Sequence, residues 1–118
     1  IEVRIAAETD GRTRFELEHT AHVDDERWAE FGPGAAGVGW DLGLLGLDLH
    51  LSSGEPVDQE WRAAWETSDE AREFMTQSSQ QWRDASIAAG EEPVRAQDAA
   101  DRTTAFYTGT APDESPGS

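Results

Sequence analysis

The sequence predicts an α+β fold, with one β-hairpin at the start and helices after it. Residues 1–8 and 14–18 alternate apolar and polar side chains, as half-buried strands do. From about residue 35 the apolar residues instead recur at helical spacing, and no third strand is predicted. Because an isolated two-stranded hairpin is marginally stable in water, we expect the chain to be the C-terminal part of a larger domain whose other strands precede residue 1.

The composition narrows the classes of partner. The 118 residues contain 25 Asp and Glu against nine basic residues, all of them Arg, and the net charge is −16. Such a charge repels nucleic-acid backbones and anionic membrane surfaces, so neither partner is expected. The sequence has no Cys, which excludes disulfides and thiolate metal sites. We expect a cytoplasmic protein that needs no cofactor.

The turn between the two strands decides which residues face the core. A two-residue loop at 10–11 would set Ile5 opposite Glu16, with apolar against acidic on one face. A three-residue loop at 9–11, with Gly11 in the left-handed region, sets Ile5 opposite Phe15 instead. The three-residue loop is therefore predicted, because it gives the hairpin one apolar face. That face carries Val3, Ile5, Phe15 and Leu17.

A short helical turn and then a long helix are predicted after the hairpin. Asp24 or Asp25 can cap the turn, which carries Trp28 and Phe31 and is interrupted by a Gly-Pro-Gly sequence. The long helix, from about 35 to 51, has apolar residues on two nearly opposite stripes, so burial on both sides is expected. One stripe holds Trp40, Leu44, Leu47 and Leu51, and the other holds Val38, Leu42, Leu45 and Leu49.

The two flanks between these stripes differ in character. Asp41 and Asp48 lie on one flank, where we expect them to face solvent. The other flank carries Gly39, Gly43, Gly46 and His50. Each Gly inside a helix costs about 1 kcal/mol relative to Ala, so this flank is expected to allow close backbone packing or to leave space beside the helix.

Three further helices are predicted in the second half of the chain. The first is short and carries Trp61 and Trp65 one turn apart. Thr67 and Glu70 form a capping-box pattern that begins the next. The predicted ranges are 57–66, 71–89 and from Pro93 to about 108, followed by a flexible tail at 109–118.

Residues suited to metal or acid–base chemistry are sparse. His19 and His22 are three residues apart, and His50 lies farther along the chain. They lack the well-spaced third ligand that a zinc site needs, so no metal site is predicted. No catalytic residue is identified from the sequence.

The apolar segment 32–51 is long enough to raise the question of a membrane span. It contains Asp41 and Asp48, and each would cost about 2.5–3.5 kcal/mol near the centre of a bilayer. A buried helix in a protein that does not bind membranes is therefore predicted.

Three segments resemble the end of a START-like, or SRPBCC, domain, in the branch named after the activator of Hsp90 ATPase. They are RTRFELEHT at 12–20, W-x-x-F-G-P-G at 28–34 and GVGWDLGLLGL at 37–47. The segment RTTAFY at 102–107 is similar to the end of actinobacterial members. The resemblance implies a helix-grip fold, in which a curved sheet wraps around a long helix. Residues 1–51 would supply its last hairpin and helix, and 52–108 a helical extension.

The resemblance also implies an apolar cavity between the sheet and the long helix. We expect the chain to bind a small hydrophobic ligand there, although the same side chains would equally suit a packed core. The superfamily also includes polyketide cyclase-like enzymes, for which His50 is the one titratable candidate, and co-chaperone-like interaction modules. The bare hairpin edge and apolar face further predict a homodimer or an exchange of strands between copies. The expected ligand-binding residues are Phe15, Leu17, Trp40, Leu44 and Leu47.

Overall fold

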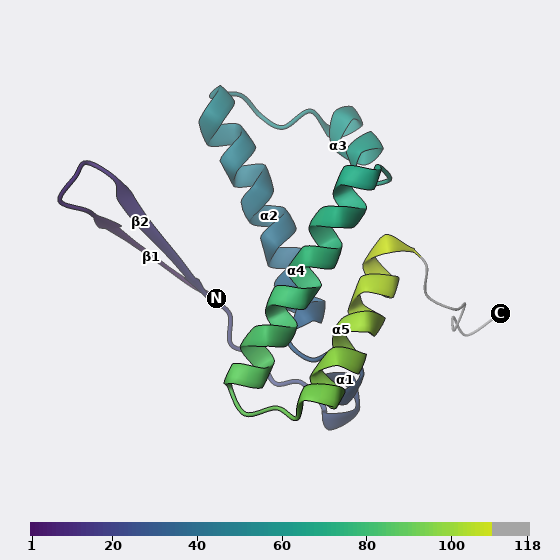
Figure 1. Cartoon of the computed structure of the whole chain (residues 1–118). Coiled ribbons are helices and arrows are strands. Elements are labelled where there is room, and N and C mark those ends of the chain that lie inside the picture. The colour runs from purple at the N-terminus through teal and green to yellow at the C-terminus, as the bar shows by residue number, and fades with distance from the viewer. Residues whose placement is uncertain (110–118) are drawn as a thin grey trace.

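This computed structural model describes residues 1–109 of the chain. They contain two strands and five helices (Figure 1). The predicted α+β class is confirmed. Apart from Gly109, the predicted tail at 109–118 lies outside the described residues. Within those residues, no helix is long and apolar enough to cross a bilayer. The elements are β1 (Glu2–Ala7), β2 (Thr13–Glu18), α1 (Asp25–Phe31), α2 (Gly34–Ser53), α3 (Gln59–Trp65), α4 (Asp69–Ala88) and α5 (Pro93–Thr108).

The two strands pair in the register that the three-residue loop predicts. Ile5 lies opposite Phe15, and Val3 lies opposite Leu17. Gly11 has a φ of +84°, the left-handed conformation that this turn requires. The predicted register is confirmed, and the four apolar side chains share one face of the hairpin.

The hairpin stands away from the helices, as Figure 1 shows. Its apolar face is largely open, since Ile5 is 69% exposed, Val3 47% and Phe15 42%. The described residues contain one two-stranded sheet, and it does not wrap around α2. Neighbouring strands are about 4.8 Å apart, so two of them are too narrow to cover a long helix.

The helical body is built on α4, which contacts both α2 and α5. On the α2 side, Val38 is fully buried and belongs to a core cluster with Met75 and Trp65. Between α4 and α5 the buried side chains are small, which lets the two helices approach closely. Those small residues include Ser79 and Ser86 of α4 and Ala96, Ala99, Ala100 and Thr103 of α5.

α1 is fixed to α5, at the other end of the described chain. The N-cap residue of α1 is Asp24, whose carboxylate accepts a hydrogen bond from the Arg27 N–H at 2.8 Å, as predicted for a cap. At its C-terminal end, Arg102 donates to two backbone carbonyl oxygens at 3.2 and 3.0 Å, and the Thr103 hydroxyl donates to the Phe31 carbonyl oxygen at 3.1 Å. These donors satisfy carbonyl groups that lack partners within the helix.

α2 is buried on one side only. Val38, Leu42 and Leu45 belong to or pack against the core that α2 shares with α4. On the opposite stripe, Leu44 is 38% exposed and Leu51 is 72% exposed. The prediction of a helix buried on both sides is therefore wrong, because the hairpin expected to cover the second side stands away from it.

Asp41 corrects a second prediction about α2. It does not face solvent, because its Oδ2 accepts a hydrogen bond from the Ser78 hydroxyl at 2.6 Å and another from the Trp82 indole N–H at 3.0 Å. Asp48, on the same flank, is exposed as predicted. The first of these two aspartates thus joins α2 to α4, while the second is solvated.

The glycines of α2 have different surroundings. A Cβ added at Gly37, which was not on the predicted flank, would overlap the Trp82 ring. On the predicted flank, a Cβ at Gly39 would lie 3.2 Å from the Tyr107 hydroxyl, whereas one at Gly43 would meet nothing within 4 Å. The flank therefore combines close packing near the start of α2 with open space farther along.

The cap of α4 is one residue later than predicted. Ser68 Oγ accepts a hydrogen bond from the Ala71 N–H at 3.1 Å. Thr67 instead donates its hydroxyl proton to the Ala64 carbonyl oxygen at 3.0 Å. Both residues are good caps by type, and the capping-box pattern selected Thr67 because Glu70 lies three residues after it, whereas Ala71 lies three residues after Ser68.

Candidate functional site: an apolar groove

An open groove of about 630 Å³ lies between the hairpin and helices α1 and α2. β2 contributes one side and α2 the other, while the segment 19–23 and α1 add further side chains. We refer to this space as the groove. Its larger apolar residues are Phe15, Leu17, Trp28, Phe31, Trp40, Leu44 and, from α4, Trp82, and its polar ones are Glu18, His19, Arg27 and Asp41.

Four of the five residues expected at a ligand site line the groove. Phe15 and Leu17 come from β2, and Trp40 and Leu44 come from α2. Leu47 does not line it and is 37% exposed farther along α2. The structure thus brings together two segments more than twenty residues apart in the sequence, around one apolar space.

Sequence reasoning missed the contribution of α1. Trp28 and Phe31 line the groove together with Pro33, and Val23 reaches it from the preceding segment. The signal available was the spacing of Trp28 and Phe31, which places both on one side of a helical turn. Without a predicted position for α1, that side could not be assigned to any neighbour.

A hydrogen bond between His19 and Trp40 connects the end of the hairpin to α2. The Trp40 indole N–H donates to His19 Nδ1 at 2.9 Å, and the two rings meet edge to face with centroids 5.6 Å apart. Because an indole N–H can only donate, Nδ1 must carry a lone pair, and the proton of the neutral imidazole then lies on Nε2. His19 therefore offers an N–H donor at the groove.

The charged residues of the groove differ in whether they have partners. Asp41 already accepts two hydrogen bonds from α4. Glu18 lies 3.6 Å from Arg4, which also bonds Glu16 at 2.7 Å and thereby lowers the pKa of the Glu16 carboxyl. Arg27 has no side-chain hydrogen bond or ion pair among the described residues.

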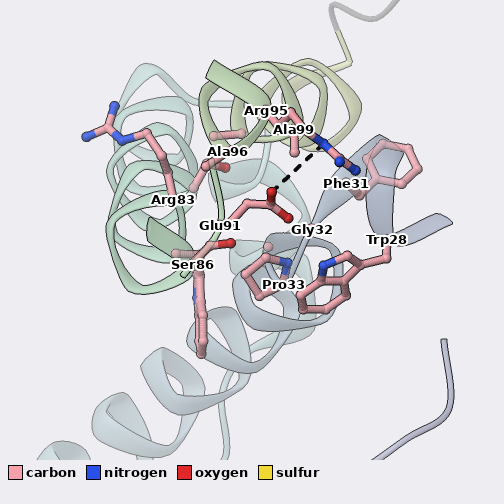
Figure 2. A pocket seen from close by; sticks show the side chains of 14 residues that line it. Trp28, Phe31, Gly32, Pro33, Arg83, Ser86, Glu91, Arg95, Ala96 and Ala99 are labelled. Atoms are coloured by element: carbon pink, nitrogen blue, oxygen red, sulfur yellow. Dashed lines mark ion pairs between the residues drawn. The ribbon is translucent and has the colours of Figure 1, made fainter. Parts of the chain in front are cut away.

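A second cavity, lined mainly by residues of α1, α4 and α5, shares Trp28, Phe31 and Pro33 with the groove (Figure 2). Its volume of about 10 Å³ is enough for one water molecule and no organic ligand. Glu91 and Arg95 form an ion pair of 3.9 Å across it. Ser79 Oγ, which also lines it, has no hydrogen-bond partner in the described part of the chain. This cavity is therefore not a candidate for ligand binding.

The candidates for metal and enzyme chemistry do not meet in the groove. Residues 1–109 contain no group of three or more His, Asp or Glu that could hold a metal ion. His50, the titratable residue expected near the cavity, does not line the groove. Its Nδ1 lies 2.7 Å from the Glu55 carbonyl oxygen at the far end of α2, so the expectation about its position is corrected.

Comparison of the chain with protein-family models, with curated proteins and with solved structures gives no match in any of the three. Function is therefore inferred from the groove itself.

Proposed function

We propose that the chain binds a small apolar ligand in the groove between β2 and α2. The observation that carries this proposal is the convergence of Phe15, Leu17, Trp40 and Leu44 on one open space of about 630 Å³. Pockets for small molecules have volumes of about 300–1,000 Å³ and are lined mainly by apolar and aromatic side chains. The groove meets both criteria.

The exposure of these side chains supports a binding site over a packed core. Phe15 is 42% exposed and Leu44 38% exposed, whereas residues of the core cluster such as Val38 and Met75 are 0% and 4% exposed. Exposed apolar side chains leave their surface hydrated, and a ligand between them would remove that surface from water. The gain on binding is about 25 cal/mol for each Å² of apolar surface buried.

A more specific form of this proposal is that the chain is part of a START-like domain, as the resemblance implies. A hairpin that faces a long helix across an apolar space is the part of a helix-grip domain that residues 1–51 would supply. A cytoplasmic location belongs to the same proposal. The polyketide cyclase-like and co-chaperone-like alternatives have no observation in their favour, and they stay predictions from the resemblance.

The test is the binding of N-phenyl-1-naphthylamine, an uncharged dye whose fluorescence rises in apolar surroundings. The wild-type chain is expected to bind it saturably. Leu44→Glu is expected to weaken binding by about tenfold or more, because it adds a charge to the wall of the groove. Leu51→Glu is the matched control, since Leu51 lies on the same stripe of α2, is 72% exposed and does not line the groove.

Two results would contradict the proposal. One is the absence of saturable dye binding by a wild-type protein whose circular dichroism shows it to be folded. The other is an equal loss of affinity in Leu44→Glu and Leu51→Glu, which would show that the dye binds elsewhere. Both variants introduce the same charge on the same helix, so a general effect of acidity is controlled.

A further inference from the structure

Arg27 is exceptional among the arginines of this acidic chain. All nine lie within the described residues, and each of the other eight has an ion pair or a side-chain hydrogen bond there. For Arg27 no partner of the guanidinium is present among residues 1–109, although the chain has 25 acidic residues against nine bases. A free guanidinium is therefore unexpected on composition alone.

Arg27 is placed where its free charge can meet a ligand of the groove. Arg27 lies on α1 and lines the groove together with Trp28 and Phe31. Arg27 is exposed, so its guanidinium is hydrated and can exchange water for a ligand. Arginine combines an apolar stem with a planar head that bonds a carboxylate through two N–H groups, which suits the edge of an apolar site.

The acids that also line the groove do not compete for Arg27. Asp41 is engaged by Ser78 and Trp82 of α4, at 2.6 and 3.0 Å. Glu18 lies 3.6 Å from Arg4 on the hairpin. With its Nδ1 occupied by Trp40, His19 presents a donor at Nε2. The hydrogen-bond donors of the groove that are left for a ligand are thus His19 and the cationic Arg27, while Glu18, whose side chain is 52% exposed, keeps a carboxylate there.

We infer that the ligand of the groove is an amphipathic carboxylate. Its apolar body would lie among Phe15, Leu17 and Leu44, and its carboxylate would accept hydrogen bonds from the Arg27 guanidinium. This inference rests on the proposed function, because it requires that the groove bind an apolar body. It adds the chemical class of the head group and the residue that recognises it.

The test compares two ligands with the same alkyl chain, decanoate and decanol, by displacement of N-phenyl-1-naphthylamine. In the wild-type chain, decanoate is expected to bind about tenfold or more tightly than decanol, because a charge-assisted bidentate pair forms only with the acid. In Arg27→Gln the two affinities are expected to become similar, with decanol binding as in the wild type.

Arg12→Gln is the matched control. Arg12 lies in the hairpin turn with a side chain that is 81% exposed and does not line the groove, and its loss changes the net charge by the same amount. This variant is expected to keep the wild-type preference for decanoate. An equal loss of preference in Arg27→Gln and Arg12→Gln would mean that long-range charge alone selects the acid, and would overturn the inference.

The outcomes separate the two proposals. If decanoate and decanol displace the dye equally well from the wild type, the carboxylate inference is wrong and the proposed apolar site stands. If neither alkyl ligand displaces a dye that binds saturably, the carboxylate inference is likewise wrong. If the dye does not bind, the proposed function itself fails. Circular dichroism of each variant establishes that the compared proteins are folded.

Discussion

At the scale of single residues, two indole N–H groups form hydrogen bonds that connect α2 to its neighbours. Trp82 of α4 donates to Asp41, and Trp40 of α2 donates to His19 beyond the hairpin. A helical wheel puts Asp41 on a flank of α2 but gives no information about the donors that α4 brings there. Those donors, Ser78 and Trp82, are 37 and 41 residues away in the sequence, well beyond the range of helical periodicity. The role of Asp41 could therefore not be predicted.

Replacing Asp41 by Ala is expected to lower the free energy of unfolding by about 1–3 kcal/mol, since the half-buried donors of Ser78 and Trp82 would lose their acceptor. Asp48→Ala, on the solvated flank, is expected to change it by less than about 0.5 kcal/mol. Urea unfolding of the two variants measures both values. Equal effects would show that Asp41 is not a structural acceptor.

Tyr107 provides a prediction about pH. Burial raises the pKa of the Tyr107 phenol, whose hydroxyl donates to the Ala35 carbonyl oxygen at 2.5 Å. The unfolded chain releases this proton near pH 10, while the folded chain retains it to higher pH. The unfolded state then binds fewer protons, so stability is expected to fall as the pH rises above about 10.

The chain is well suited to this measurement, because it has one Tyr and neither Lys nor Cys to titrate in the same range. Urea midpoints recorded between about pH 9 and 11 should decrease for the wild type and stay level for Tyr107→Phe. A decrease of the same size in both proteins would assign the effect to another group.

At the scale of elements, local patterns predicted the hairpin better than the surroundings of α2. The Asp10-Gly11 turn and the alternating apolar residues were sufficient for the register, because opposed residues must share a face. For α2, periodicity predicted both stripes but not which of them would find a neighbour. Whether a stripe is covered depends on where the hairpin lies relative to α2. The connecting segment 19–24 sets that position, and helical periodicity gives no information about it.

The glycines of α2 give a paired prediction. Gly37→Ala is expected to destabilise the fold by about 1–3 kcal/mol, because the new methyl group would overlap the Trp82 ring. Gly43→Ala, in open space on the same helix, is expected to stabilise it by up to about 1 kcal/mol through helix propensity. Thermal unfolding compares the two variants. A destabilised Gly43→Ala would mean that something packs against this position.

At the scale of the whole molecule, the groove lies between the exposed apolar face of the hairpin and the more exposed apolar stripe of α2. Sequence reasoning identified four of its residues, because an apolar hairpin face and an apolar stripe were both visible. It did not identify α1 or His19, since their contribution depends on the packing of α1 against α5. The free Arg27 became visible only once the partners of the other arginines were known.

The open edge of β1 carries the remaining prediction, a homodimer. Hydrogen-bonded and non-bonded pairs alternate along antiparallel strands, and the Glu8 N–H bonds the Arg12 carbonyl oxygen. Counting back from Glu8, every second residue of β1 bonds to β2, and Val3 falls among the residues between them. The backbone N–H and C=O of Val3 therefore point away from β2, toward the open edge. Pairing about a two-fold axis at Val3 would set Glu2 opposite the partner's Arg4 and Ile1 opposite the partner's Ile5. Opposite charges and apolar residues would both match.

Sedimentation velocity tests this pairing. The wild type is expected to sediment increasingly as a dimer as its concentration rises. Val3→Pro is expected to remain monomeric, since it removes an outward N–H and leaves the bonds within the hairpin intact. A wild type that stays monomeric, or a Val3→Pro chain that dimerises equally, would show that the β1 edge is not the interface.

The most direct test of the central claim, that the groove is a ligand site, is the contact map of a bound ligand by nuclear Overhauser effects. With N-phenyl-1-naphthylamine bound, we predict intermolecular effects to the Phe15 ring of β2 and to the Leu44 methyl groups of α2 in the same complex. Effects confined to one of these elements, or to Leu51 and the opposite side of α2, would contradict the account.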